Sequence, residues 1–429
     1  MPEVASVKPQ LPHAPLQAGT MTPFWLPASH FTAGLLFFVS AAVLLPFVAS
    51  DMVSGRFLLP RIVALVHLIT LGWLSVSIMG ALCQLFPVAL STPLRWPKLS
   101  AITLALFAPG LLLFVIGMLL TRSGLIVAGA ALFGAALLLF IVNAYGTLLR
   151  APRRELTWWT LALGFFFLLA TVAFGGSLAG NYRWSYLGDR RLAALALHMH
   201  VAMGGWVLLI VMAVGRRLLP MFLLSHRAHE APVKVAITSM SAGALLLTLL
   251  HGFMTRSVFV VATLLMGVAV VALITQVALY VRARHRPQLD AGLRLVVAAG
   301  VLMLIAVGLG LAVLLTRAPL QLVSAYGIAA VGSLTLFVAG HYYKILPFLV
   351  WNHRFAPLVG KRPLPRIVEL YNARVAGLAA LGLAAGLYGL VIAALFDAPV
   401  PATVAAIAFT LGAVTEAGQL LRLLRTRVA

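Results

Sequence analysis

The chain is poor in charged residues, and acidic residues are the scarcest of them. Of its 429 residues, 62% are hydrophobic and 9% are charged, and nine Asp and Glu stand against 31 Lys and Arg. Soluble globular domains carry about a quarter of charged residues, so this composition excludes an ordinary water-soluble fold. The sequence predicts an integral membrane protein.

Cysteine is almost absent. The single one, Cys83, lies within a hydrophobic run. One thiol excludes disulfides, the Cys-x-x-Cys-His attachment of a covalent haem, iron–sulfur clusters and thiolate zinc sites. Any metal centre must therefore rest on histidine, or on a cofactor held without covalent links.

The formal net charge of +22 is spread over short segments between hydrophobic runs. Nucleic-acid binding needs a basic face on a folded soluble domain, and none of these segments is long enough to form one. No nucleic-acid partner is expected. Residues 1–29 are polar and rich in proline, without the basic start and short apolar core of a signal peptide, so we expect a tail there.

Long apolar runs dominate the rest of the chain. A membrane-spanning helix needs roughly 20 mostly apolar residues. The sequence therefore predicts an all-α integral membrane fold, with one transmembrane domain over 30–429 embedded in the lipid bilayer. Twelve runs are long enough, over 31–50, 62–88, 100–120, 124–149, 157–178, 193–215, 235–255, 258–281, 294–316, 320–342, 375–396 and 401–421.

The basic residues are unequally divided between the two sides of this predicted bundle. With successive connections assigned to alternate sides, 23 Lys and Arg fall on the side of the termini and 8 on the other. Basic residues favour the cytoplasmic side of a membrane. We therefore expect a multi-pass protein of the bacterial inner (plasma) membrane, with both termini cytoplasmic.

Two of the predicted helices carry the same pattern. From His67 the chain reads HLITLGWLSVSIMGALCQLFP, and from His200 it reads HVAMGGWVLLIVMAVGRRLLP, 133 residues later. A weaker third copy ends at Pro347, with Gly327 in place of the histidine. A fixed period of this kind indicates internal repeats. The sequence predicts three four-helix pseudo-repeats, over 30–150, 151–287 and 288–429.

Four histidines fall in the outer third of the predicted membrane: His67, His198, His200 and His251. A titratable side chain at that depth is costly unless it is paired or coordinated, so each is a candidate metal ligand, the alternative being a hydrogen-bonded packing residue. Residues two apart on a helix are rotated by about 200°, so His198 and His200 cannot ligate one iron from one side. His67 and His200 hold equivalent repeat positions, which suits a bis-histidine haem.

Other polar residues are weaker candidates. Arg183, Arg190 and Arg191 precede the sixth predicted helix and could pair with haem propionates, although membrane loops often carry scattered arginines. Glu416 is the one carboxylate well inside a predicted span, in a proton or ion path or simply reaching toward the interface. We expect the remaining histidines to be solvated or interfacial, namely His13, His30, His226, His229, His285, His341 and His353.

The string His198-Met-His200, followed by Gly205-Trp206 and Pro220, resembles the His-x-His helix of the haem-copper oxidase superfamily, closest to its cbb-type members. Twelve helices in three four-helix arcs are also the layout of that family's subunit I. The resemblance implies that His200 and His67 hold a low-spin haem b and that His198 holds a second haem.

The chain departs from that family at the copper site. The His-Pro-Glu-x-Tyr helix and the His-His pair that bind copper are missing, and His251 alone cannot replace them. Copper thus has weak support, and ordinary oxygen reduction is disfavoured. The chain is more similar to a divergent, oxidase-like haem protein, akin to the NnrS-type membrane proteins linked to nitric oxide.

These observations predict a b-type haem protein that transfers respiratory electrons, or binds or reduces a diatomic gas such as NO or O2. Its redox partner would be a cytochrome or a quinol, and an oxidoreductase activity stays open. Two alternatives fit the same helices: a multi-spanning secondary transporter, since repeats and buried polar residues are typical there, and a structural or assembly subunit of a respiratory complex without its own cofactor.

Overall fold

A computed structural model describes residues 22–223, 225, 229–253, 255–285 and 288–426. These described residues confirm an all-α fold with twelve helical spans long and apolar enough to cross a membrane. The first six are α1 (Trp25–Val53), the α2–α3 span (Pro60–Leu90), α4 (Pro97–Leu119), α5 (Ser123–Leu148), α6 (Leu156–Trp184) and the α7–α8 span (Gly188–Met221). The others are α9 (Ala231–Leu249), α10 (Arg256–Arg282), α11 (Ala291–Leu315), the α12 span (Leu320–Leu358), α13 (Ala373–Leu395) and α14 (Pro399–Arg425).

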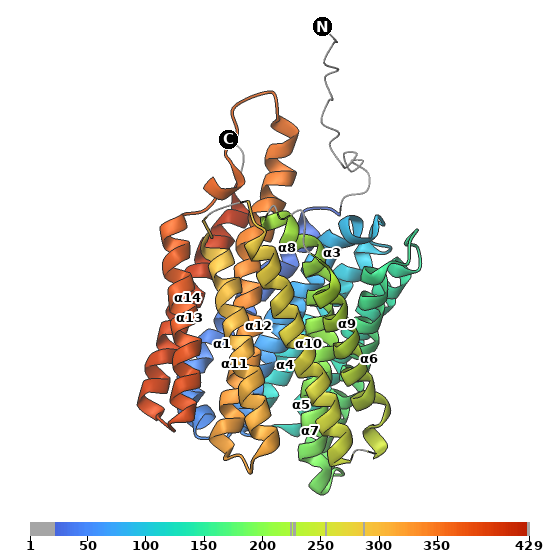
Figure 1. The fold of residues 1–429 in the computed structure, drawn as a ribbon, viewed down its shortest axis with the longest axis vertical. Helices are drawn as coiled ribbons and strands as arrows, with labels where there is room; N and C mark the ends of the chain where they lie inside the picture. Colours follow the sequence, from blue (N-terminus) through green and yellow to red (C-terminus); the bar gives the residue numbers. More distant parts are fainter. Residues whose placement is uncertain (1–21, 224, 226–228, 254, 286–287, 427–429) are drawn as a thin grey trace.

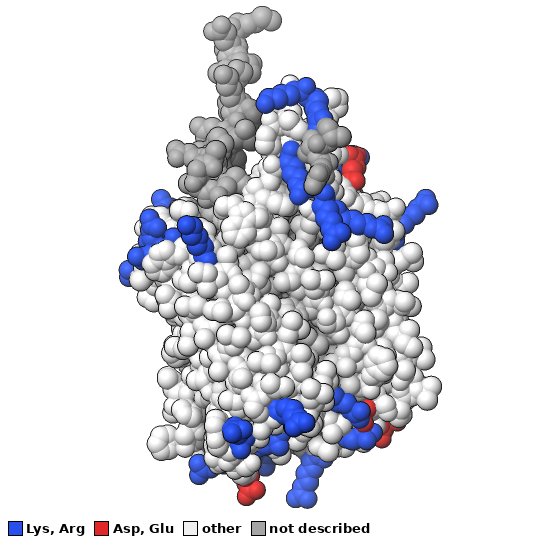
Figure 2. Space-filling view, turned by 180° about the vertical axis from the view of Figure 1, so that it is seen from behind, with Lys and Arg blue, Asp and Glu red and all other residues white. Residues whose placement is uncertain are grey.

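The helices stand side by side in one bundle, with α1 beginning and α14 ending at the same end (Figure 1). We call this the terminal end and the other the distal end. The face seen in Figure 2 carries its Lys, Arg, Asp and Glu near these two ends and shows a broad uncharged band between them. Such a band fits the hydrocarbon layer of a bilayer, because charged side chains there are costly. The protein is a multi-span membrane protein.

The three most buried spans are the second, the sixth and the tenth. Their most hydrophobic windows are 72%, 61% and 56% buried, whereas those of α10 and α11 are 22% buried. The three inner spans therefore recur every four helices along the chain. The remaining helices surround them and present apolar side chains outward, as lipid-facing helices do.

The second and sixth spans also share an irregularity. Each changes from α-helix to π-helix directly after its histidine, over Leu68–Ser75 and over Val201–Leu208, and returns to α-helix at Val76 and Leu209. The two π-helical segments lie 133 residues apart, as the sequence copies do. π-helical turns are rare and are often found at functional sites.

The two copies pack closely against their neighbours and against each other. A Cβ on Gly72 would lie 2.6 Å from Phe37 Cβ, and one on Gly205 would lie 2.7 Å from Phe167 Cβ. Each glycine thus lets the first helix of its repeat unit approach the second. The indole Nε1 of Trp206 donates to Ser75 Oγ at 3.2 Å, which joins the two π-helical segments directly.

The observed boundaries differ from the predicted ones in three places. Helix α1 begins at Trp25 and so includes the last residues of the predicted tail, of which 1–21 lie outside the described residues. The tenth span continues past residue 342 because Lys344 is neutralised by an ion pair with Asp290. Helix α9 ends at Leu249 rather than at 255, which places His251 outside it.

A glycine substitution tests the tight packing of the repeat helix. Gly205→Ala forces a methyl group against Phe167 and should lower the free energy of unfolding by about 1–3 kcal/mol, the usual cost of overpacking. Gly418→Ala on α14 is the matched control, because nothing lies within 4 Å of its added Cβ and alanine favours a helix. Thermal unfolding in detergent measures both. Equal melting temperatures for the two variants would contradict the close approach.

Candidate functional site

His67 is the last residue of α2 (Pro60–His67). Its Nδ1 donates to the carbonyl oxygen of Val63 at 2.8 Å, and its ring lies 4.8 Å, centroid to centroid, from that of Phe114 on α4. A carbonyl can only accept, so this bond keeps the proton on Nδ1 and leaves the lone pair of Nε2 available. An imidazole held in this way is prepared to bind a metal through Nε2.

His198, on α7 (Arg191–His200), faces α6. Its ring lies beside Thr171 and Gly175, and a Cβ on Gly175 would come within 2.9 Å of the ring carbon Cε1. The Nδ1 atom is buried and has no hydrogen-bond partner among the described residues. His198 also interacts electrostatically with His67. The structure therefore brings these two imidazoles into the same part of the bundle.

His200 points to the other side of its helix. Its Nδ1 donates to the carbonyl oxygen of Ala196 at 2.7 Å, and its Nε2 lies 3.2 Å from the hydroxyl of Tyr326 on α12. The two rings are stacked, with centroids 6.2 Å apart, and Phe259 of α10 packs edge-on against the imidazole. As the helical geometry predicted, His198 and His200 face different neighbours.

His251 does not join the other three. It lies in a short 3-10 turn after α9 and is exposed, with its Nδ1 bonded to the Thr248 carbonyl at 2.9 Å and its ring against Phe174. The prediction of a place inside the outer membrane layer is wrong, because the helix ends before reaching it. No group of three or more His, Cys, Asp or Glu able to hold a metal ion occurs among the described residues, so copper gains no support from the structure.

The three remaining imidazoles border open space. His67, His198 and His200 are half-buried, although they belong to the two most buried spans of the bundle. Gly327 of α12, which occupies the histidine position of the third copy, has no atom within 4 Å of where its Cβ would be. A planar group would find room beside rings placed in this way.

Three arginines lie at the distal end near these histidines. Arg183 and Arg190 are exposed, and the guanidinium of Arg191 lies over the Tyr182 ring at 5.4 Å. The Arg183 guanidinium reaches to within 4.0 Å of a Cβ built on Gly124, at the start of α5. None of the three makes an ion pair within the described part of the chain, so all three are available to an anionic group.

No protein-family model matches this sequence, and no curated protein matches it significantly. The site must therefore be interpreted from its own chemistry.

Two other histidines are placed differently from the expectation. His30 and His341, predicted to be solvated or interfacial, are buried, and each donates Nδ1 to the carbonyl four residues earlier, of Leu26 and of Phe337. Helices keep buried imidazoles satisfied by this bond. His229 and His285 are exposed, His353 is half-buried, and His13 and His226 lie outside the described residues.

Two residues of the site were not predicted, Gly175 and Tyr326. Gly175 lies in a run of small residues without a polar group to mark it. Tyr326 directly precedes Gly327, so a firmer reading of the third copy could have drawn attention to it.

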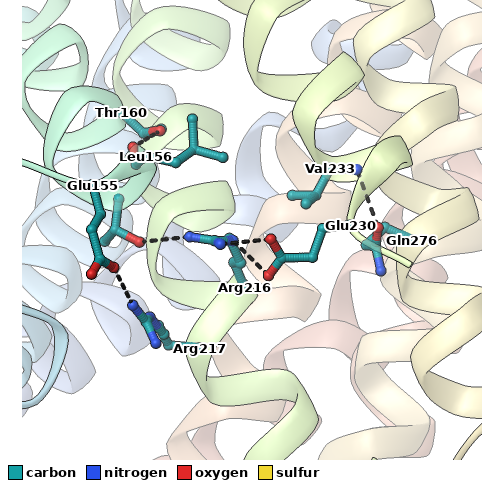
Figure 3. Close-up of polar contacts among 9 residues, drawn as sticks. Glu155, Leu156, Thr160, Arg216, Arg217, Glu230, Val233 and Gln276 are labelled. Atoms are coloured by element: carbon teal, nitrogen blue, oxygen red, sulfur yellow. Dashed lines mark hydrogen bonds and ion pairs between the residues drawn. The ribbon is translucent and has the colours of Figure 1, made fainter. Parts of the chain in front are cut away.

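A second polar cluster lies at the terminal end, where Arg216 of α8 is central (Figure 3). Its Nε and Nη2 donate to the two oxygens of Glu230 at 3.0 and 2.6 Å, and its Nη1 donates to Thr157 of α6 at 3.3 Å. Arg217 pairs with Glu155 at 2.9 Å. Because every charge is paired and the residues come from α6, α8 and the start of α9, this cluster fastens three helices together.

The Arg216 hydrogen bond holds the pKa of the Glu230 carboxyl below its usual value. A carboxyl with a lowered pKa stabilises the fold above its unfolded pKa and loses that contribution as the pH falls through the folded one. Glu230→Gln should therefore lower the melting temperature at pH 7, by about 1 kcal/mol or less because Glu230 is 40% exposed, and the difference from wild type should vanish in acid.

Thermal unfolding in detergent at neutral and acidic pH measures this difference. The control is Glu155→Gln, whose ion pair is half exposed on both sides and should matter less. A difference between wild type and Glu230→Gln that grows in acid would contradict the assignment.

Proposed function

We propose that this chain is a b-type haem protein of the bacterial inner membrane, acting in respiratory electron transfer or in binding a diatomic gas. The observation that carries the proposal is the pair His67 and His198. They come from two different inner spans, interact electrostatically, and each has a ring nitrogen without a hydrogen bond to the described residues. Two such imidazoles can supply the axial ligands of one haem b.

This pairing differs from the one expected from the resemblance, in which His67 is paired with His200. His200 has both ring nitrogens engaged, with Ala196 and Tyr326, and faces α10 and α12. His67 faces α4 and His198 faces α6, so both belong to the side of the bundle closed by α4, α5 and α6. We therefore assign the low-spin haem to His67 and His198.

The surroundings of this pair favour a haem over a bare metal ion. The carbonyl of Val63 fixes the tautomer of His67, as the outer-shell partner of a metal-bound histidine does. Arg183, Arg190 and Arg191 lie on α6 and α7 beside the same region and would bind the two propionates through charge-assisted hydrogen bonds. A haem held in this way supplies one-electron transfer, in exchange with a cytochrome or a quinol.

His200 and Tyr326 mark a second position. If a second haem binds, His200 would be its single protein ligand, and the phenol would lie near that ligand as a hydrogen-bond donor. A haem with one axial protein ligand keeps an open coordination position, which is what binding of NO or O2 requires. Copper chemistry is not part of the proposal.

Two rival functions have less support. A secondary transporter usually places charged residues along its path, yet the buried acidic side chains of the described residues are Asp51, paired with Arg56 and Arg61 at the distal end of α1, and Glu416. A structural subunit without a cofactor would have no use for imidazole nitrogens left unpaired. A single spectroscopic experiment separates both rivals from the proposal.

The test is a reduced-minus-oxidised absorbance spectrum and a pyridine haemochrome assay on protein expressed with ample haem and purified in detergent. We expect a low-spin b-type signal that is lost in His67→Ala and in His198→Ala, because each variant removes one axial ligand. His200→Ala should keep it. A colourless, folded wild-type protein would refute haem binding.

The same variants decide the pairing. Loss of the signal in His200→Ala with retention in His198→Ala would replace His198 by His200 as the partner of His67. The exposed His251→Ala is the matched control and should leave the spectrum unchanged, since this residue lies outside the helix bundle.

A further inference from the structure

Glu416 is the most deeply buried acid of the described residues. It lies on α14 with no exposed surface, and neither of its carboxylate oxygens has a hydrogen-bond partner among them. An ionised carboxylate taken out of water without a partner carries a very large energetic cost, so such groups become neutral or acquire a ligand. The structure therefore poses the question of what Glu416 binds.

The groups around Glu416 are hydrogen-bond donors. Gln419, one turn along α14, accepts from the backbone N–H of Asn372 with its Oε1 at 2.9 Å, which fixes the orientation of the amide. Its Nε2 therefore carries the free donors, and it is buried without a partner. The hydroxyl of Tyr343 on α12 is likewise buried without a partner and interacts electrostatically with Glu416.

This composition distinguishes between a proton and a metal cation. A cation site needs several oxygen ligands, but here the amide turns its nitrogen inward and the phenol is a donor. A carboxylic acid uses the same donors well, because its carbonyl oxygen accepts from them while its own proton neutralises the charge. The local chemistry fits a protonated acid.

No fixed charge nearby offers an alternative. The ionisable residues that interact with Glu416 are Tyr342 and Tyr343 of α12. The stretches of α1 and α13 beside α14, residues 31–42 and 375–386, contain no ionisable side chain. On α14 itself, Arg422 is exposed and lies six residues away.

A water-sized cavity adjoins this site. The Tyr342 hydroxyl bonds to Ser77 Oγ at 2.7 Å, and both residues, together with His341, line a cavity of about 70 Å³ between α1, α3, α8 and α12. A water molecule needs roughly 10–15 Å³ on this measure, so the cavity has room for several. On the other side, Gln419 and Asn372 connect Glu416 to the exposed start of α13 at the terminal end.

We propose that Glu416 is a proton-binding site, protonated at neutral pH and exchanging its proton with water through the Gln419 and Tyr343 cluster. The ligand is a proton, and the site is independent of haem binding. It lies in the half of the bundle nearer the terminal end, nine residues before the end of α14.

Infrared spectroscopy of the purified protein in lipid nanodiscs tests the proposal. We expect a protonated carboxylic acid C=O band at neutral pH that moves to lower frequency in D2O and is missing in Glu416→Gln. Tyr343→Phe should shift the band, because it removes one donor. Glu369→Gln, which alters an exposed ion-paired acid, is the control and should leave the band in place.

A second measurement needs no substitution. Glutamate labelled with ¹³C at its side-chain carboxyl should move the band in the wild-type protein, since Glu155, Glu230 and Glu369 are ion-paired and ionised. The proposal is overturned if the acid band is absent at neutral pH, if it persists in Glu416→Gln, or if added Na⁺ abolishes it and so reveals a cation site.

Discussion

Inside a bilayer, a polar group that does not find a partner within the protein finds none at all, and this constraint organises the whole molecule. Helical threonines and serines donate to the carbonyl four residues earlier, as Thr70 does to Val66 and Thr171 to Phe167. Charged residues pair at the ends of the bundle, as Arg216 does with Glu230. Against this background, a buried polar atom without a partner is informative, and His198 Nδ1 and both oxygens of Glu416 stand out.

The same constraint explains why the second and sixth spans can leave regular α-helical geometry. A π-helical turn keeps backbone groups hydrogen-bonded while it changes the direction in which side chains point. Both π-helical segments begin directly after a histidine and contain a fully buried tryptophan, Trp73 or Trp206. The irregularity costs little in lipid because it adds no exposed backbone, and it separates the histidine layer from the regular lower part of each inner helix.

The number of spans could be predicted from the sequence because lipid imposes a minimum apolar length, and the repeat indicated which helices are innermost. Depth along a helix also followed from residue spacing, as for His67 and His198. Rotation did not, since facing partners come from distant parts of the chain. Tyr326 lies opposite His200 only because α12 packs beside it, and His67 is nearer to His198 than the repeat implied. His251 failed for a local reason, because α9 ends two residues before it.

The histidines and Glu416 lie at opposite depths, and their separation limits how they can influence each other. His67 is 7 residues from the distal start of its span and Glu416 is 9 from the terminal end of α14, so the two lie roughly 20 Å apart by helical rise. At that distance a unit charge changes the other site by about 1 kcal/mol or less at an effective dielectric constant of roughly 20. Direct electrostatics is therefore weak. Any stronger coupling must run through Tyr342, Ser77 and the cavity between the inner helices, where hydrogen bonds and water can relay a proton that a field alone cannot move.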